Sequence, residues 1–230
     1  KYFNYTKEGY RKSKHQSEYS TKNFNIYLFG GSTTFGTSVR DEDTIASAMN
    51  EIFHANKTCD RKISVFNYGT PGHFSTQEFI RLLQLIKNDR KPNIAIFIES
   101  EFWPNLISEI SKKKIPIFLL NARISKKSFY RWQVFPKFSK YLFSKFDQVI
   151  AQDESSKERL ISLGFKNVKN LGNLKFLSEK LPCNFKKLSS LESKVKKRFI
   201  LLIASSHKNE EEKILNIFFQ IKNKIPEILL

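Results

Sequence analysis

Short apolar runs alternate with stretches of helical periodicity along most of the chain, and this alternation limits the possible fold more than any other feature. Six runs have the length and composition of buried strands: residues 26–29, 63–67, 94–98, 115–120, 148–151 and 168–171. Helices are expected at 41–55, from Ser75 onward, at 106–114, within 125–146 and at 155–163. Because strands that alternate with helices pair in parallel, the sequence predicts an α/β fold, a doubly wound, Rossmann-like parallel sheet over residues 24–176.

The remaining segments lie toward the two ends of the chain. Residues 1–23 are polar and basic, and we expect them to form an extended arm. Residues 179–198 are expected to be a polar linker. Residues 199–230 are expected to start a second α/β domain, with a strand at 199–204 and a helix at 209–222. The sequence starts at Lys1 and stops at Leu230 inside an apolar run, which favours a fragment of a longer protein.

The formal net charge of +18 suits an anionic partner, either nucleic acid or a membrane. The basic residues are mostly lysines spread along the chain, without zinc-finger or RNP-like spacing, so no nucleic acid is expected. Residues 126–145 interleave basic and aromatic side chains. They either lie against anionic lipid or form an ordinary amphipathic helix with a solvated basic face. A compositional bias toward Lys, Asn, Ile and Phe explains the charge about equally well.

Cysteine and histidine usage argues against disulfides and metals. Cys59 and Cys183 are too few for a disulfide framework or a thiolate metal site, and they fit a reducing compartment. No carboxylate or histidine cluster has ligand spacing, so no metal is expected. The longest apolar runs, 115–120 and 199–204, are shorter than the roughly 18 residues that a spanning helix needs.

The string FGGSTTFG at residues 29–36 places Ser32 among glycines directly after an apolar run. Backbone N–H groups in such a turn can stabilise an oxyanion beside the hydroxyl. With Asn67-Tyr68-Gly69, the string resembles the first blocks of the SGNH/GDSL hydrolase family over residues 24–93. The resemblance implies an ester hydrolase with Ser32 as the nucleophile and Gly69 as an oxyanion donor. The alternatives are that Ser32 caps a turn, or that the loop binds phosphate.

That hydrolase family also needs a G-x-N-D block and a D-x-x-H near its C-terminus, and both are absent. A serine hydroxyl without a general base is a poor nucleophile. The sequence therefore favours a structural role for Ser32 over a catalytic one.

Three later strings form an ordered series: IAIFIESEFWPNLI, IPIFLLNARIS and FSKFDQVIAQDESSKERLISLGFKNVKNLGNLKF. Together they resemble the N-terminal domain of 3-deoxy-D-manno-octulosonic acid (Kdo) transferases over residues 94–178. ASSHKNEEEKIL at 204–215 resembles the start of that family's nucleotide-binding domain. The resemblance implies a glycosyltransferase of lipopolysaccharide biosynthesis that moves Kdo from CMP-Kdo to a lipid A precursor. It implies no cofactor beyond this donor, and a peripheral location at the cytoplasmic face of a Gram-negative inner membrane.

The charges that develop during Kdo transfer suggest which side chains act. The sugar gains oxocarbenium-like positive charge and the leaving CMP phosphate gains negative charge, so a carboxylate and an ammonium group suit the two centres. The resemblance assigns these transition-state roles to Glu99, which ends an apolar run, and to Lys175 in GNLKF. Glu101 would point the same way as Glu99 in an extended chain and is the rival for its role.

Further residues are candidates for substrate binding. Asn121 and Arg123 follow the run 115–120, at the edge of a sheet where α/β ligand clefts form. The resemblance adds Asn173 of GNLKF, and Ser206 and His207 before the helix expected at 209–222. Two alternatives stay open: Arg123 in a surface ion pair, and His207 as a helix-capping neighbour.

The two resemblances meet near Lys91-Pro92-Asn93, where both families carry a K-P-x stretch that leads into an apolar strand. The general base of the Kdo transferases lies in a Gly-containing N-terminal loop, and hydrolase-like sequence stands in its place. We therefore expect a degenerate or mis-joined chimera that catalyses neither reaction at a useful rate. Ser32 and Glu99 should follow neighbouring parallel strands and share one cleft, with Gly69 on its rim and Lys175 reaching in.

Overall fold

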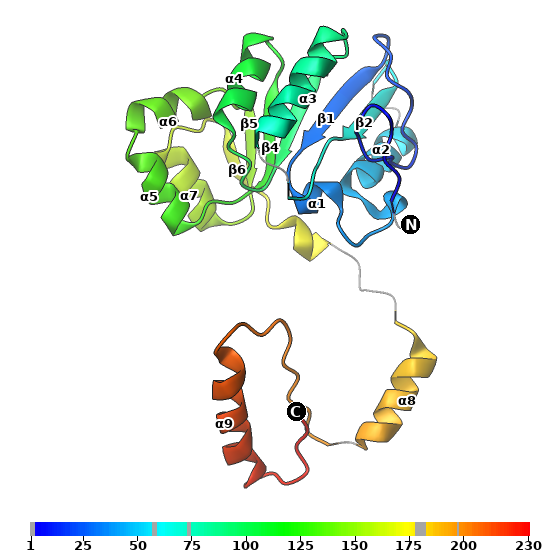
Figure 1. Ribbon diagram of the computed structural model, residues 1–230, viewed down its shortest axis with the longest axis vertical. Helices are drawn as coiled ribbons and strands as arrows, with labels where there is room; N and C mark the ends of the chain where they lie inside the picture. The colour runs from blue at the N-terminus through cyan, green and yellow to red at the C-terminus, as the bar shows by residue number, and fades with distance from the viewer. Residues whose placement is uncertain (1–2, 57–58, 73–74, 178–182, 197) are drawn as a thin grey trace. The chain divides into compact units, whose positions relative to one another are not determined.

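A six-stranded parallel sheet forms the centre of the first part of the computed structural model (Figure 1). The structure describes residues 3–56, 59–72, 75–177, 183–196 and 198–230, without the side chains of residues 75–78 and 177. The strands are β1 (Phe24–Phe29), β2 (Ile63–Asn67), β3 (Ile94–Ile98), β4 (Ile117–Ala122), β5 (Gln148–Ala151) and β6 (Val168–Asn170). Their order is β2-β1-β3-β4-β5-β6, and every described pairing is parallel. The predicted α/β class is therefore confirmed.

The strand order reverses direction between β1 and β3. From β1 the chain goes first to β2 on one side and then to β3 on the other. The loops that leave the carboxyl ends of these two strands therefore diverge to opposite sides of the sheet. Such a switch point is where open α/β sheets form ligand clefts, so the topology alone locates a candidate site beyond Phe29 and Ile98.

Helices cover the two faces of the sheet unequally. The helices of this part are α1 (Ser32–Phe35), α2 (Ile45–Ala55), α3 (Ser75–Lys87), α4 (Pro104–Lys112), α5 (Lys126–Gln133), α6 (Pro136–Phe143) and α7 (Glu154–Ser162), with short 3-10 turns η1 (Asp41–Asp43) and η2 (Leu174–Leu177). The larger core holds apolar residues of α3, α4, α6 and α7, and α3 lies beside α4 (Figure 1). The smaller core packs α2 against the other face of β1, β2 and β3.

Local chemistry sets where several helices begin. Thr44, Ser125 and Asp153 each accept a backbone N–H from three residues further along, which satisfies a donor in the first turn. The helix expected at 41–55 is consequently split, because Thr44 is extended and separates η1 from α2. Pro104 occupies the first turn of α4, where its missing N–H costs nothing.

The N-terminal segment does not form the extended arm that we expected. Tyr10 is 7% exposed and the Arg11 side chain is fully buried. The Arg11 guanidinium donates to the carbonyls of Phe35, Gly36 and Val39 at 2.6 to 2.8 Å, and its Nε lies 2.7 Å from Asp41 Oδ1. Its backbone N–H donates to the Asn67 carbonyl. Arg11 thus fixes the loop that connects α1 with η1, and composition alone gives no sign of this role.

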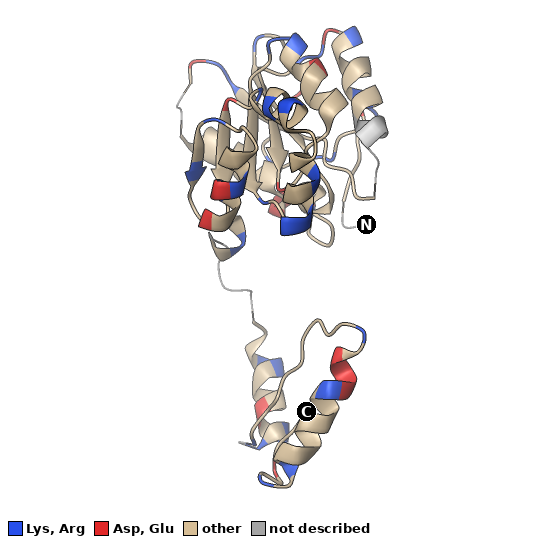
Figure 2. Ribbon diagram, turned by 90° about the vertical axis from the view of Figure 1, so that its left-hand side faces the viewer, with Lys and Arg blue, Asp and Glu red and all other residues tan. Residues whose placement is uncertain are grey.

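Basic side chains are spread over many elements of the structure (Figure 2), as the sequence indicated. Acidic residues gather at the start of α9 (Glu210–Lys222), where Glu210, Glu211 and Glu212 occupy the first turn. Negative charge is favourable there because the N–H groups of a first turn carry partial positive charge. Across the described residues, no helix is both long enough and apolar enough to cross a membrane.

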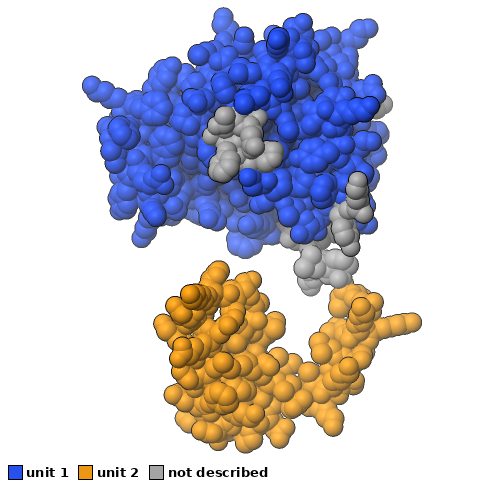
Figure 3. Space-filling model, viewed as in Figure 1, with its two compact units in different colours: residues 1–178 blue, residues 179–230 orange. Residues whose placement is uncertain are grey.

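The second compact unit, residues 179–230, differs from expectation in two ways (Figure 3). Part of the expected linker is helix α8 (Phe185–Val195), which starts where the Asn184 side chain accepts the Lys187 N–H. The strand expected at 199–204 is absent, and the segment forms only an isolated parallel bridge between Ile200 and Leu229. An apolar run needs neighbouring strands to become part of a sheet, and the described part of this unit offers none. The expected helix at 209–222 is confirmed as α9.

Replacement of Arg11 tests its structural role. In Arg11→Met, Asp41 loses its cationic partner and the buried loop carbonyls lose their donors, so the free energy of unfolding should fall by about 3–5 kcal/mol. Urea unfolding followed by circular dichroism measures the difference. Lys14→Met, which breaks the exposed ion pair with Glu51, is the matched control and should change stability little. Equal effects of the two substitutions would contradict the role given to Arg11.

Candidate functional site

The carboxyl edge of the sheet collects most of the residues predicted to act. Ser32 follows β1, Glu99 follows β3 and Asn121 lies at the end of β4. Strands β1 and β3 are direct neighbours, with Phe29 opposite Phe97. The predicted placement of Ser32 and Glu99 beyond neighbouring parallel strands is therefore confirmed.

A cleft of about 420 Å³ opens at this edge. Ser32, Asn121 and Lys175 line it together, with Ile98 at its floor and the loop before α2, including Val39 and Thr44, as a wall. That wall belongs to the loop that Arg11 holds. Residues far apart in the sequence thus share one cavity at the carboxyl edge of the sheet. Glu99 was expected to share this cleft with Ser32, but it is not among the residues that line it.

Glu99 and Lys175 form an ion pair beside the cleft, with Oε1 and Nζ 3.9 Å apart. The lysine side chain is 66% exposed, so the pair contributes little to stability. Glu99 has a φ of +69°, which non-glycine residues rarely adopt, and backbone bonds to Leu120 and Arg123 hold it there. Strained positions of this kind cluster at functional sites, where the surrounding structure maintains them.

Glu101, the rival carboxylate, has a different environment from Glu99. Its Oε1 accepts the Gly31 N–H at 3.0 Å and so connects the loop after β3 to the loop after β1. Burial raises the pKa of the Glu101 carboxyl above its usual range, although the hydrogen bond from Gly31 opposes the shift. The geometry favours Glu99 for the charge pair with Lys175 and gives Glu101 a connecting role.

Two asparagines predicted to bind substrate hold backbone groups instead. Asn121 is 3% exposed, and its Oδ1 accepts the Leu174 N–H at 3.1 Å. Asn173 Oδ1 accepts the Lys175 N–H at 3.0 Å, and its Nδ2 donates to Gln152 at 3.3 Å. Through these bonds, the turn that carries Lys175 is attached to Asn121 of β4 and to Gln152 after β5.

The hydrolase-like residues Ser32 and Gly69 are not arranged for catalysis. Ser32 is exposed, and its hydroxyl makes no hydrogen bond to any other described residue. The Gly69 N–H donates to Asn67 Oδ1 at 3.0 Å, so it is already used. Gly69 is buried rather than on the rim of the cleft, because α1 lies against it: a Cβ there would be 2.4 Å from the Phe35 nitrogen.

Sequence reasoning missed the amide of Asn67 as an organising group. The side chain is fully buried at the end of β2, and its Nδ2 donates to the Thr34 carbonyl at 3.0 Å. Together with the bond from Gly69, it ties α1 to β2. A polar residue ending an otherwise apolar strand was the signal that could have indicated it.

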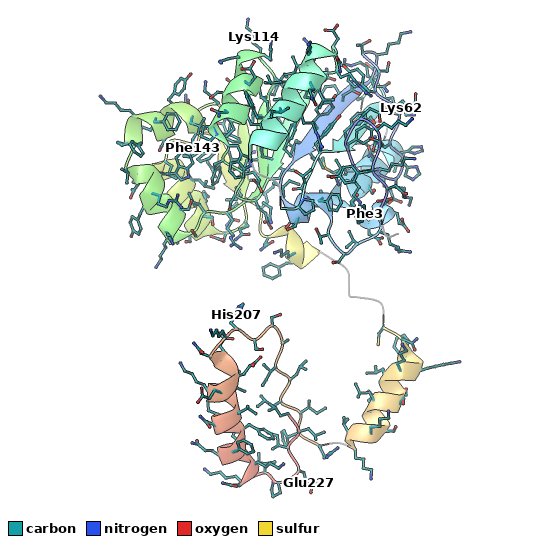
Figure 4. The ribbon with its side chains drawn as sticks, viewed as in Figure 1. Phe3, Lys62, Lys114, Phe143, His207 and Glu227 are labelled. Atoms are coloured by element: carbon teal, nitrogen blue, oxygen red, sulfur yellow. The ribbon has the colours of Figure 1, made fainter. Side chains whose placement is uncertain are left out.

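The remaining candidates are not among the residues that line the cleft. Arg123 is exposed at the same edge of the sheet as Glu99. In the second unit, the Ser206 hydroxyl donates to Glu211 at 2.7 Å and the His207 N–H to Glu210 at 2.9 Å. His207 lies just before α9 (Figure 4). Both bonds lie at the start of α9, whose N-cap residue Asn209 makes no side-chain capping bond. No group of three or more His, Cys, Asp or Glu in the described ranges is placed to hold a metal ion.

Comparison with known sequences identifies one family. The family described as 3-deoxy-D-manno-octulosonic-acid transferase (kdotransferase) matches residues 74–178. The 3-deoxy-D-manno-octulosonic acid transferase of Rickettsia bellii is 39% identical over 142 residues, which cover 62% of this chain and 34% of the relative. The Haemophilus influenzae protein of the same description is 33% identical over 172 residues, covering 73% of this chain and 39% of the relative. The predicted resemblance to Kdo transferases is confirmed.

The extent of these matches bears on the expected chimera. The chain spans between 34% and 39% of the length of these two relatives. The family match starts at residue 74, inside the stretch that resembles SGNH hydrolases and before the expected join at residues 91–93. The Kdo-transferase-like segment thus includes α3 as well as the strands that follow it.

Solved structures of two kinds show weaker likeness. AlinE4, an SGNH-hydrolase family esterase, gives a TM-score of 0.45 at 15% identity, covering 77% of this chain and 95% of that one. The UDP-GlcNAc 2-epimerase from Neisseria meningitidis gives 0.44 at 16% identity, covering 89% and 64%. TM-scores at this level support no choice between the esterase and the epimerase.

The environment of Glu101 generates a pH-dependent prediction. A carboxyl whose pKa is raised on folding stabilises the protein most below its ordinary value of 4.5, and this contribution is lost as the pH rises through the folded-state pKa. From about pH 4 to about pH 7, the stability of wild type should therefore fall relative to Glu101→Gln, whose amide oxygen can still accept the Gly31 N–H. Urea unfolding across this range measures the difference, and a constant difference would contradict it.

Proposed function

We propose that this chain, which carries a segment of the Kdo transferase family, is part of a glycosyltransferase that moves Kdo from CMP-Kdo to a lipid A precursor. The observation that carries the proposal is the pairing of Glu99 with Lys175 across 3.9 Å beside the cleft. These residues occupy the positions that the family motifs E-x-E-x-W-P-N and G-N-L-K-F indicate, and they come from segments far apart in the sequence.

The charges of this pair suit the proposed reaction. As the bond between Kdo and CMP breaks, positive charge develops on the sugar and negative charge on the departing phosphate. Glu99 would stabilise the first and Lys175 the second. In the free protein the two groups neutralise each other, so neither charge is left uncompensated before substrate enters. The side chain of Lys175 is long and mostly exposed, which allows it to follow the phosphate.

A chimeric enzyme tests this proposal. Residues 74–178 would replace the matching segment of the Rickettsia bellii transferase, and Kdo transfer to a lipid A precursor would be measured. The chimera should transfer Kdo, whereas Glu99→Gln and Lys175→Met within it should each lower the rate by about a hundredfold or more.

The control for these variants is another lysine–glutamate pair of the same segment. Lys112 Nζ lies 3.4 Å from Glu109 Oε2 on α4, away from the cleft. Lys112→Met and Glu109→Gln should leave transfer unchanged. A folded chimera without transfer, or equal losses from the two pairs, would count against the proposed function.

We further propose that α5 and α6 lie against anionic lipid at the cytoplasmic face of a Gram-negative inner membrane. Residues 126–145 contain six Lys or Arg and no Asp or Glu. Four large apolar or aromatic side chains on these helices or at their junction are more than 60% exposed: Tyr130, Val134, Phe135 and Tyr141. Basic residues that flank exposed aromatic ones suit the boundary between headgroups and acyl chains, where a lipid acceptor would be found.

Vesicle sedimentation tests this surface. The chain should bind vesicles that contain phosphatidylglycerol more strongly than neutral ones, and binding should weaken with salt because screening shortens the range of the attraction. Tyr130→Ser with Phe135→Ser should weaken binding severalfold. Ile52→Ser, which changes an apolar residue on α2 that is 57% exposed, should not. Binding that is independent of lipid charge would refute the proposed surface.

A further inference from the structure

We propose that Asn121 is a positioning residue, whose side-chain oxygen fixes the turn η2 so that Lys175 is held beside Glu99. The inference rests on the proposed function in one respect: the proposed function makes the position of Lys175 important. It differs from the substrate-binding role that the sequence predicted for Asn121, because the side-chain oxygen of this residue is bonded to the protein itself.

The position of Asn121 is specialised in both backbone and side chain. Its φ is +51°, in the left-handed region that Asn adopts more readily than most other residues. The residue is 3% exposed at the carboxyl end of β4 and also lines the cleft. A polar side chain that is almost completely buried at such a point needs a partner, and Asn121 Oδ1 has one in the Leu174 N–H at 3.1 Å.

Two consecutive N–H groups of the turn are held in the same manner. Asn121 accepts from Leu174, and Asn173 accepts from Lys175 at 3.0 Å. Asn173 is itself bonded to Gln152, the residue after β5, at 3.3 Å. The turn is thus attached to the ends of two strands by side-chain amides.

The described apolar side chains of the turn are largely exposed. Leu174 is 39% exposed and Phe176 is 86% exposed. A lysine side chain has many rotamers, so its ammonium group is confined only when the backbone that carries it is fixed. The hydrogen bond from the Leu174 N–H to Asn121 Oδ1 is therefore a buried attachment of the backbone next to Lys175. It constrains where the lysine side chain leaves the backbone, and hence whether its Nζ can reach Glu99.

Three variants separate the side-chain oxygen from the backbone conformation. Asn121→Gly tolerates the positive φ but removes the acceptor, whereas Asn121→Asp keeps an acceptor oxygen. Asn167→Gly is the matched control. Asn167 also has a φ of +51°, and its side-chain Nδ2 donates a hydrogen bond to the Asp147 carbonyl, but it lies before β6 at the opposite edge of the sheet.

Two readouts on the full 230-residue chain follow the turn directly: hydrogen exchange of the Leu174 amide, and the rate of Lys175 acetylation measured by peptide mass spectrometry. In Asn121→Gly, the Leu174 amide should exchange at least about fivefold faster and the acetylation rate of Lys175 should change severalfold, while β4 amides stay protected. Asn121→Asp and Asn167→Gly should remain within about twofold of wild type.

Unchanged Leu174 exchange in Asn121→Gly would overturn the proposal, and so would an equal effect of Asn167→Gly. Loss of protection in Asn121→Asp would also overturn it, because that variant retains the acceptor. Neither readout depends on Kdo transfer. If Asn121→Gly loosens the turn while Glu99→Gln and Lys175→Met leave Kdo transfer by the chimeric enzyme unchanged, the positioning role would be supported and the proposed function refuted.

Discussion

The parallel pairing of β1 with β3 determines where the site lies. It joins the hydrolase-like and transferase-like parts of the sequence in one sheet, with Ile26 opposite Ile94 and Phe29 opposite Phe97. Side chains secure the pairing at both ends. At the amino end, Asn93 Oδ1 accepts the Asn25 N–H at 2.8 Å, and at the carboxyl end Glu101 accepts the Gly31 N–H. A cleft opens where the strand order reverses, lined by the loop after β1, by Ile98 of β3, by Asn121 of β4 and by the turn that carries Lys175.

The polar groups around this cleft divide into those that hold the backbone and those that remain accessible. Asn67, Asn121 and Glu101 are bonded to backbone N–H or carbonyl groups, and Arg11 fixes the outer loop from behind. Glu99 and Lys175 are more exposed and pair with each other across 3.9 Å. Groups of the first kind use their hydrogen bonds to hold the backbone, whereas the Glu99–Lys175 pair remains accessible to solvent.

The sequence predicted the sheet well because alternating apolar runs depend on local composition. Three strands, 63–67, 94–98 and 148–151, match residue for residue. The run 199–204 looks equally apolar but has no described neighbours to pair with, and the burial of Arg11 depends on a loop about thirty residues away. In the site, strand order predicted that Ser32 and Glu99 follow neighbouring strands, but the expected sharing of one cleft did not follow, since Glu99 is not among its lining residues. The hydrogen bonds of Asn121 and Gly69 could not be predicted from the sequence, since each depends on contacts that no sequence pattern encodes.

Native-state hydrogen exchange tests the account most directly, because its central claim is that residues on both sides of the β1–β3 pairing form one cooperative sheet. Exchange would be measured for amides of β1, β3 and β4 at increasing urea below the unfolding transition. The account predicts that Leu28, Ile96 and Leu119 converge on the same free energy of opening, equal to that of global unfolding. An opening of β1 at clearly lower free energy, with β3 and β4 still protected, would show that the two parts fold separately and share no cleft.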